Sequence, residues 1–276
     1  MTAGYDADVI RSARSLLFVP GNRPGRFPKA MAAQPDIVIL DLEDAVAADD
    51  KATAREHVAE WFAAGRPGMV RINAADTPWH EADLELIRRH RVPVMLAKAE
   101  SVEQIRHITD LAPGVSIIPL IETATAVAAV GKLCTVEGVV RLAFGSIDFA
   151  NQIGVDPDDW DALLLHRSML VLGSAAAGLP APIDGVTTSL TDSDAVTGDF
   201  TYARRLGMGA KLCIHPAQVA AVHAAATTTE ADVQWAQKVI RAFDAANGSA
   251  AAVDGQMIDV PVVERARHIL ATAADR

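Results

Sequence analysis

Short runs of aliphatic and β-branched residues alternate with longer stretches of helical spacing along most of this 276-residue chain. Each run is apolar throughout, as in parallel strands that are buried on both faces. Between the runs, apolar residues recur every three or four positions, which predicts a helix after each strand. The runs occupy residues 16–19, 37–40, 69–72, 94–96, 116–120, 139–144 and 211–214, with a weak further strand near 181–184.

Eight strands that alternate with helices over about 215 residues predict a (β/α)8 TIM barrel, an α/β fold for which about 250 residues are typical. A doubly wound open sheet gives the same alternation and is the alternative. The first strand, however, runs into Pro20-Gly21-Asn22-Arg23-Pro24 instead of a Gly-x-Gly-x-x-Gly loop. That difference disfavours a dinucleotide-binding fold.

The chain continues beyond the last predicted strand. We predict the barrel over residues 1–225 and a C-terminal helical extension over 226–276, which packs on the barrel or on a neighbouring subunit. The extension contains helices at 230–247 and from 262 to about 273, joined by a flexible stretch of small residues. Within the barrel, the helix at 161–177 has an apolar stripe that we expect to be buried. Its members are Leu164, Leu165, Met169, Leu172 and Ala176.

Charge and composition exclude several classes of partner. The net charge of −10 and the pI near 5.2 argue against nucleic acid and anionic membranes, which need a basic footprint. No run of about 18 apolar residues is present, so no membrane span is expected. The first residues lack the apolar core of a secretory signal, and two cysteines cannot form a disulfide framework. We therefore expect a cytoplasmic protein.

Charged side chains follow nearly every predicted strand, at the end where a barrel builds its active site. Carboxylates that converge there repel one another and favour a cation. Because no Cys or His cluster accompanies them, the expected ion is Mg²⁺, with Mn²⁺ as an alternative. We predict Glu122 and Asp148 as its ligands, since they close two consecutive strands. The other residues at strand ends are Asp41, Glu43, Asp44, Arg71, Lys98, Glu100, Asp184 and His215.

Each of these side chains also has a purely structural interpretation. A carboxylate after a strand is commonly a helix N-cap, although Thr123 and Ser146 are available for capping here. Arg71 either binds a substrate carboxylate with its planar fork or forms an ion pair with the acids after the second strand. Lys98 is expected to support an acid rather than form a Schiff base, because nearby carboxylates would raise its pKa.

Nine short segments occur in a fixed order between residues 16 and 261. They are LFVPGNRP (17–24), ILDLEDAV (39–46), VRIN (70–73), LAKAES (96–101), IET (121–123), FGSID (144–148), IDGV (183–186), KLCIHPAQ (211–218) and GQMIDVP (255–261). Each is weak alone. As an ordered set they resemble the citrate lyase beta-subunit-like branch of the HpcH/HpaI aldolase superfamily, which includes malyl-CoA and citramalyl-CoA lyases.

The resemblance implies a barrel that assembles into homotrimers or hexamers. It implies Mg²⁺ on Glu122 and Asp148 and a substrate carboxylate on Arg71. It also implies that Asp259, in the extension, reaches a neighbouring subunit's site as an acid/base. Without the resemblance, Asp259 is interpreted as the N-cap of the last helix, where Pro261 suits the first turn.

Substrates of the resembling family are thioesters of coenzyme A or of an acyl carrier protein. The basic residues Arg23, Arg26 and Lys29 are candidates for binding the thioester phosphates, and a solvated helix face is the alternative interpretation. Ala97, Ala210 and the pair Thr227-Thr228 depart from the family pattern. The exact thioester and its carrier therefore stay open.

We predict a Mg²⁺-dependent carbon–carbon lyase that cleaves or forms a malyl-, citramalyl- or citryl-type thioester with a 2-oxo acid. Thioester hydrolysis at the same site is an alternative, as is a citrate-lyase-type subunit that requires an acyl carrier protein. A binding protein that has lost its chemistry is disfavoured, because the residues expected to act are present. They are Arg71, Glu122, Asp148 and Asp259, with Asp41, Glu43, Asp44 and Lys98 expected to support them.

Overall fold

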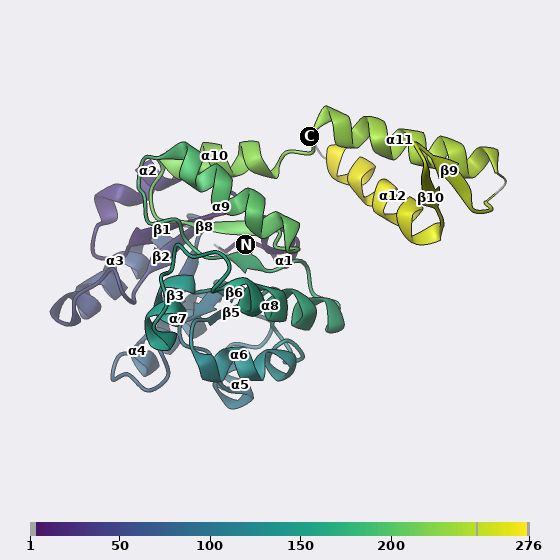
Figure 1. Ribbon diagram of the computed structural model, residues 1–276. Coiled ribbons are helices and arrows are strands. Elements are labelled where there is room, and N and C mark those ends of the chain that lie inside the picture. Colours follow the sequence, from purple (N-terminus) through teal and green to yellow (C-terminus); the bar gives the residue numbers. More distant parts are fainter. Residues whose placement is uncertain (1–3, 247, 275–276) are drawn as a thin grey trace. The chain divides into compact units, whose positions relative to one another are not determined.

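A closed barrel of eight parallel strands forms the body of the protein, which we describe from a computed structural model (Figure 1). The structure describes residues 4–246 and 248–274. Each strand pairs with its sequence neighbours, and the last pairs with the first, so the sheet has no open edge and the doubly wound alternative is excluded. The strands are β1 Ser15–Pro20, β2 Ile37–Asp41, β3 Met69–Ile72, β4 Val94–Leu96, β5 Ile117–Ile121, β6 Ala143–Phe144, β7 Ile183–Asp184 and β8 Ala210–Cys213.

Helices surround the barrel and connect consecutive strands, as the apolar spacing predicts (Figure 1). Some of them start with ordinary capping chemistry: Ser101 and Gln104 form a capping box at α5, and Thr123 accepts from the Ala126 N–H at α6. The helices are α1 Ala7–Ser12, α2 Phe27–Ala32, α3 Lys51–Ala63, α4 His80–His90, α5 Val102–Leu111, α6 Ala124–Leu133, α7 Ser146–Ile153, α8 Leu164–Ala176, α9 Ser193–Arg205 and α10 Ala217–Ala226.

Two local predictions were wrong. Only Ala143 and Phe144 of the expected strand at 139–144 form β6. Within that segment Arg141 is buried and donates to the carbonyls of Ile10, Ala13 and Ala181, so its side chain closes the amino-terminal end of the barrel. No local pattern indicated that Arg141 would be buried, because its partners are carbonyl groups distant along the chain.

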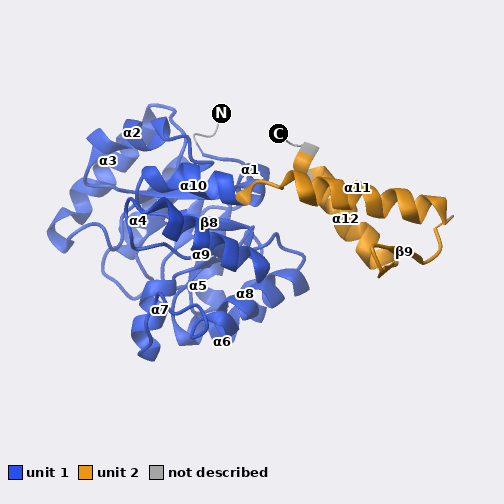
Figure 2. Cartoon of the chain, turned by 45° about the horizontal axis from the view of Figure 1, so that its top comes forward, with its two compact units in different colours: residues 1–225 blue, residues 226–276 orange. Residues whose placement is uncertain are grey.

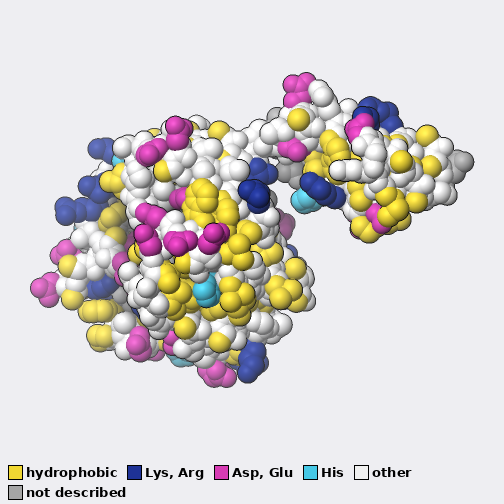
Figure 3. Space-filling view, in the orientation of Figure 1, with side chains coloured by type: hydrophobic (Ala, Val, Ile, Leu, Met, Phe, Trp, Pro, Cys, Tyr) yellow, Lys and Arg dark blue, Asp and Glu magenta, His cyan; other side chains and the backbone are white. Residues whose placement is uncertain are grey.

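The apolar stripe predicted to bury α8 is instead largely exposed. Leu165 and Leu172 are 61% and 70% exposed, whereas Arg167, Leu170 and Ser174 face inward. Hydrophobic side chains gather on this face of the molecule (Figure 3). The pattern is reversed because Arg167 pairs with the buried Asp184, which turns a polar residue toward the barrel.

The chain divides into two compact units, and the boundary between them along the sequence falls between Ala225 and Ala226 (Figure 2). In the second unit, α11 Glu230–Ala245 and α12 Val260–Ala274 pack around a small core. Between them, β9 Ala251–Val253 and β10 Gln256–Ile258 form a hairpin across part of the stretch expected to be flexible. Asn247 lies outside the described residues.

The hairpin turn consists of Asp254 and Gly255, both at positive φ (52° and 79°). Asp-Gly is a favoured pair for such two-residue turns, so the signal was present in the sequence and was missed. In the part of the chain that the structure describes, no helix is long and apolar enough to cross a membrane.

Candidate active site

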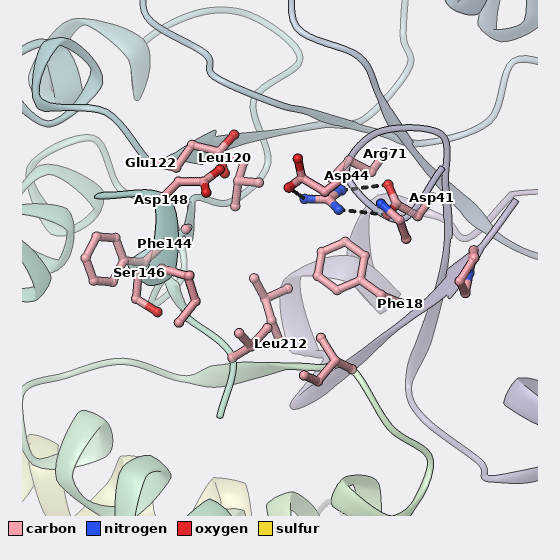
Figure 4. Close-up of a pocket in the computed structure, with 16 residues that line it drawn as sticks. Phe18, Asp41, Asp44, Arg71, Leu120, Glu122, Phe144, Ser146, Asp148 and Leu212 are labelled. Carbon is pink, nitrogen blue, oxygen red and sulfur yellow. Dashed lines mark hydrogen bonds and ion pairs between the residues drawn. The ribbon is translucent and has the colours of Figure 1, made fainter. Parts of the chain in front are cut away.

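A pocket of about 370 Å³ lies at the carboxyl ends of the barrel strands (Figure 4). Its charged lining residues are Asp41, Asp44, Arg71, Glu122 and Asp148. Glu122 and Asp148 lie on one side, and Arg71 lies with Asp41 and Asp44 on the other (Figure 4). The fold thus brings into one pocket charged residues that are up to 107 positions apart in sequence, from 41 to 148, as their places after the strands predicted.

Arg71 is held by three carboxylates. Asp41 is its direct neighbour across β2 and β3 and accepts from Nε and Nη2, both at 2.7 Å. Nη1 lies 3.1 Å from Glu43 and 3.3 Å from Asp44. Burial alone would lower the pKa of Arg71, but Asp41 and Glu43 raise it above its usual range. The ion-pair interpretation therefore describes part of its role, yet the guanidinium still lines the pocket and lies 4.6 Å over the ring of Phe18.

Lys98 joins the two sides of the pocket. Its Nζ lies 2.8 Å from Oε1 of Glu43 and 3.7 Å from Oδ2 of Asp148. Burial alone would raise the pKa of Glu43, but Arg71 and Lys98 lower it to about 2. Burial alone would lower the pKa of Lys98, but Glu43 and Glu122 raise it above its usual range, which disfavours a nucleophilic amine. Burial and the Glu43 carboxylate raise the pKa of Asp44 to about 6.

Glu122 is 2% exposed and directly follows β5. Its Oε1 accepts the backbone N–H of Lys98 at 2.7 Å, while burial and the charge of Glu43 raise its pKa to about 8. Gly145 packs so closely that a Cβ there would lie 2.3 Å from the Cβ of Glu122. Only glycine can occupy this position without moving the carboxylate.

Asp148 lies in the first turn of α7 and its side chain is 38% exposed. Ser146 was available to cap this helix but does not do so, because the N-cap residue is Gly145 and no side chain caps the helix. Thr123 caps α6 as expected and leaves Glu122 free of that task. Neither predicted metal ligand is therefore occupied as a helix cap.

The site can hold a hard divalent cation. Five carboxylates (Asp41, Glu43, Asp44, Glu122 and Asp148) face two cations (Arg71 and Lys98), which leaves three negative charges when all are ionised. Among the described residues, no three His, Cys, Asp or Glu side chains converge as a closed metal site. A pair of carboxylates with open positions is the arrangement that Mg²⁺ usually takes.

Two supports were missed by the sequence analysis. Lys51 is 6% exposed, and its Nζ donates to the carbonyls of Leu42 and Glu43 and to the side chain of Asn73. It therefore fixes the loop that carries the acids around Arg71. The second support is a buried ion cluster around the paired residues Asp184 of β7 and Lys211 of β8. For the second support the available signal was Lys211, a lysine within an otherwise apolar segment, whereas Lys51 follows Asp49 and Asp50 and had no such signal.

Two predicted residues lie outside the pocket lining, and a third belongs to the second unit. Arg23 and Lys29 are exposed near the start of α2 and do not line the pocket. Asp259 is half-buried in the second unit, where the N–H of Val263 bonds to its carbonyl and the N–H of Val262 lies 3.4 Å from its Oδ1. Asp259 thus begins α12 in the manner of an N-cap.

The fold and the pocket define a TIM-barrel enzyme with a carboxylate-rich mouth that can bind a cation. Residues 14–216 match the family described as HpcH/HpaI aldolase/citrate lyase. The chain belongs to this family, which confirms the prediction of a carbon–carbon lyase at the level of the family.

The comparisons with individual proteins cover nearly the whole chain. It is 31% identical to the mitochondrial citramalyl-CoA lyase of Rattus norvegicus, over 94% of this chain and 86% of the relative. It is 29% identical to a (3S)-malyl-CoA thioesterase of Cereibacter sphaeroides, over 94% of each. The crystal structure of CitE from Mycobacterium tuberculosis with magnesium, acetoacetate and coenzyme A superposes with a TM-score of 0.84 and 32% identity, covering 96% and 99% of the two chains.

Proposed function

We propose that this protein is a Mg²⁺-dependent lyase acting on a malyl-, citramalyl- or citryl-type coenzyme A thioester. It cleaves the thioester to an acyl-CoA and a 2-oxo acid, or runs the reverse condensation. The observation that carries the proposal is the pairing of Glu122 and Asp148 beside Arg71 in one pocket. Two open carboxylates and a guanidinium are the groups needed to hold a cation and an oxo acid together.

Each side chain has a defined task in this proposal. Glu122 and Asp148 hold Mg²⁺, which when bound polarises the carbonyl oxygen of the oxo acid. Arg71 binds and orients the oxo-acid carboxylate, and Asp41 keeps its guanidinium plane fixed through two hydrogen bonds. Asp259 moves the proton at the α-carbon of the thioester. Arg23 and Lys29 are proposed to contact the phosphates of the carrier.

Coenzyme A is proposed as the carrier because the CitE structure of Mycobacterium tuberculosis contains it and the rat relative is named for a CoA ester. An acyl carrier protein is the alternative.

Both cysteines are free and buried, and we propose a cytoplasmic location, where thiols stay reduced.

One assay separates the possible activities. Purified protein with Mg²⁺ is given a panel of malyl-, citramalyl- and citryl-CoA, and free thiol and 2-oxo acid are followed together. We expect 2-oxo acid and acyl-CoA without free thiol. Thiol without oxo acid would identify a thioesterase, the activity for which the Cereibacter sphaeroides relative is named. Turnover only with a carrier-protein thioester would identify a subunit of a larger complex.

Replacing Arg71 with lysine tests its proposed contact with substrate. Lysine keeps the charge but loses the planar fork that binds a carboxylate with two parallel hydrogen bonds. We expect a KM for the 2-oxo acid raised on the order of tenfold or more, since a bidentate contact is worth more than one kcal/mol. The KM for acyl-CoA should change little. Equal losses for both substrates, together with a lower melting temperature, would assign Arg71 only to its acid network.

We propose that the protein is a homo-oligomer, with a trimer or hexamer expected from the family resemblance. The exposed apolar stripe of α8 supports a subunit contact, because water-facing leucines at 61% and 70% exposure gain from being covered.

Leu165→Glu with Leu172→Glu should dissociate the oligomer while leaving the melting temperature of the barrel nearly unchanged. Light scattering after size exclusion measures the mass, and Ala63→Glu on exposed α3 surface is the control. An oligomer that survives the double change would contradict this interface.

A further inference from the structure

Three charged side chains form a buried cluster where Asp184 of β7 pairs with Lys211 of β8, and Arg167 of α8 completes it. Asp184 is fully buried, and its two oxygens lie 2.7 Å from Nε of Arg167 and 3.2 Å from Nζ of Lys211. Burial alone would raise the pKa of Asp184, but Lys211 and Arg167 lower it, so the carboxylate stays charged. Nη1 of Arg167 is buried without a hydrogen-bond partner among the described residues. The cluster therefore holds three charges away from water.

Stability alone is a poor explanation for such a cluster. Removing charges from water costs several kcal/mol per ion, and apolar side chains of similar volume often stabilise a protein as well or better. None of the three residues lines the pocket, so none touches substrate. Their contacts instead lead toward the residues proposed to hold the cation.

The first step leads from Lys211 to the segment after β6. Nζ of Lys211 also donates to the carbonyl of Gly185, at 2.9 Å. Gly185 in turn packs directly against Ser146, since a Cβ at Gly185 would lie 2.1 Å from the Ser146 hydroxyl and 3.2 Å from the Phe144 carbonyl. The hydrogen bond from Lys211 therefore holds the backbone of Gly185 in place, and Gly185 contacts the start of α7.

The second step leads from that segment to both carboxylates. Gly145 packs against Glu122 on one side, while its neighbour Ser146 packs against Gly185 on the other. Ser146 begins α7, and Asp148 lies in the first turn of this helix. The guanidinium of Arg167 lies 5.6 Å over the ring of Phe144, which directly precedes Gly145. A shift of the segment would displace Asp148 relative to Glu122.

We propose that Arg167, Asp184 and Lys211 are positioning residues that set the separation of the Glu122 and Asp148 carboxylates by clamping the segment from Phe144 to Ser146. The cluster acts only through backbone and packing contacts. This inference rests on the proposed function of Glu122 and Asp148 as cation ligands. It attributes the separation of the two carboxylates to buried charges outside the pocket lining.

The decisive variant replaces the whole cluster with apolar side chains: Arg167→Met, Asp184→Leu and Lys211→Met together. Asp199 loses its 4.0 Å ion pair with Lys211, but it is partly exposed and keeps its hydrogen bonds from Trp160 and Thr187. No other charge is left unpaired, so the melting temperature should stay within a few degrees of that of the wild type. The Kd for Mn²⁺, measured by electron paramagnetic resonance on the full chain, should rise about 10- to 100-fold, as when outer partners of metal ligands are lost. The kcat/KM of the Mg²⁺ enzyme should fall in parallel.

Arg141→Met is the matched control. It removes another buried cation, at the opposite end of the barrel, and should lower the melting temperature without changing the Kd for Mn²⁺. If the triple variant does not fold, Lys211→Met is measured below its own melting temperature and corrected for its folded fraction. A wild-type Kd in either folded variant overturns the proposal. A wild type that binds Mn²⁺ but cleaves no thioester overturns the proposed reaction alone, while one that binds none overturns both.

Discussion

Glu122→Gln and Asp148→Asn are each expected to lower kcat/KM on the order of a thousandfold or more, as when a group that stabilises developing charge is removed. Each change removes one of the two carboxylates that face the same pocket. The protein should stay folded. Burial and Glu43 raise the pKa of Glu122 to about 8, so without a cation the carboxyl is mostly neutral at pH 7 and an amide of the same shape replaces it at little cost to folding. Loss of activity would then reflect loss of the cation.

Binding and stability must be measured beside activity. Titration with Mn²⁺ should show a Kd raised at least tenfold for both variants, while thermal unfolding shows no loss of stability. Glu137→Gln makes the same chemical change at an exposed carboxylate and should leave all three measurements unchanged. An Asp148→Asn protein that turns over normally at ordinary Mg²⁺ concentrations would exclude this ligand assignment.

The barrel could be predicted because its signal is local and repeated. Runs such as 37–40 and 94–96 are buried on both faces, so each is apolar at every position. This continuous pattern distinguishes each strand from the helix that follows it, where apolar residues recur every three or four positions. The charged residues at strand ends followed from the same rule, since parallel strands bring their carboxyl ends to one mouth. Glu122 and Asp148 were chosen because they close two consecutive strands, and the family resemblance implied the same pair.

The errors arise where a distant partner reverses a local pattern. The face of α8 was misassigned because Arg167 turns inward to pair with Asp184, and nothing within the helix reveals this partner. Strand β6 is short because Arg141 bonds to carbonyls more than 120 positions away along the chain, at Ile10 and Ala13. Buried charges satisfied by tertiary contacts leave no periodic trace in a sequence.

Asp259 combines a structural and a proposed chemical task, and the two can be separated. As the N-cap of α12 it needs only a side-chain oxygen that accepts an N–H, which asparagine supplies about as well as aspartate. As an acid/base it needs a group that exchanges a proton, which asparagine lacks. Asp259→Asn should therefore preserve the helix, whereas Asp259→Ala should lose about 1 kcal/mol of stability in that unit.

We expect Asp259→Asn to lower kcat by about 100- to 10,000-fold, the usual contribution of a positioned acid/base. Its melting temperature, oligomer mass and Kd for Mn²⁺ should match those of the wild type. Mixing and re-equilibrating this variant with Asp148→Asn then tests whether the acid acts in a neighbouring subunit. Partial recovery requires that one subunit supply the carboxylates and another supply Asp259. If mixed oligomers stay inactive, the acid serves only its own chain, and if Asp259→Asn alone is fully active, Asp259 is a helix cap with no part in the chemistry.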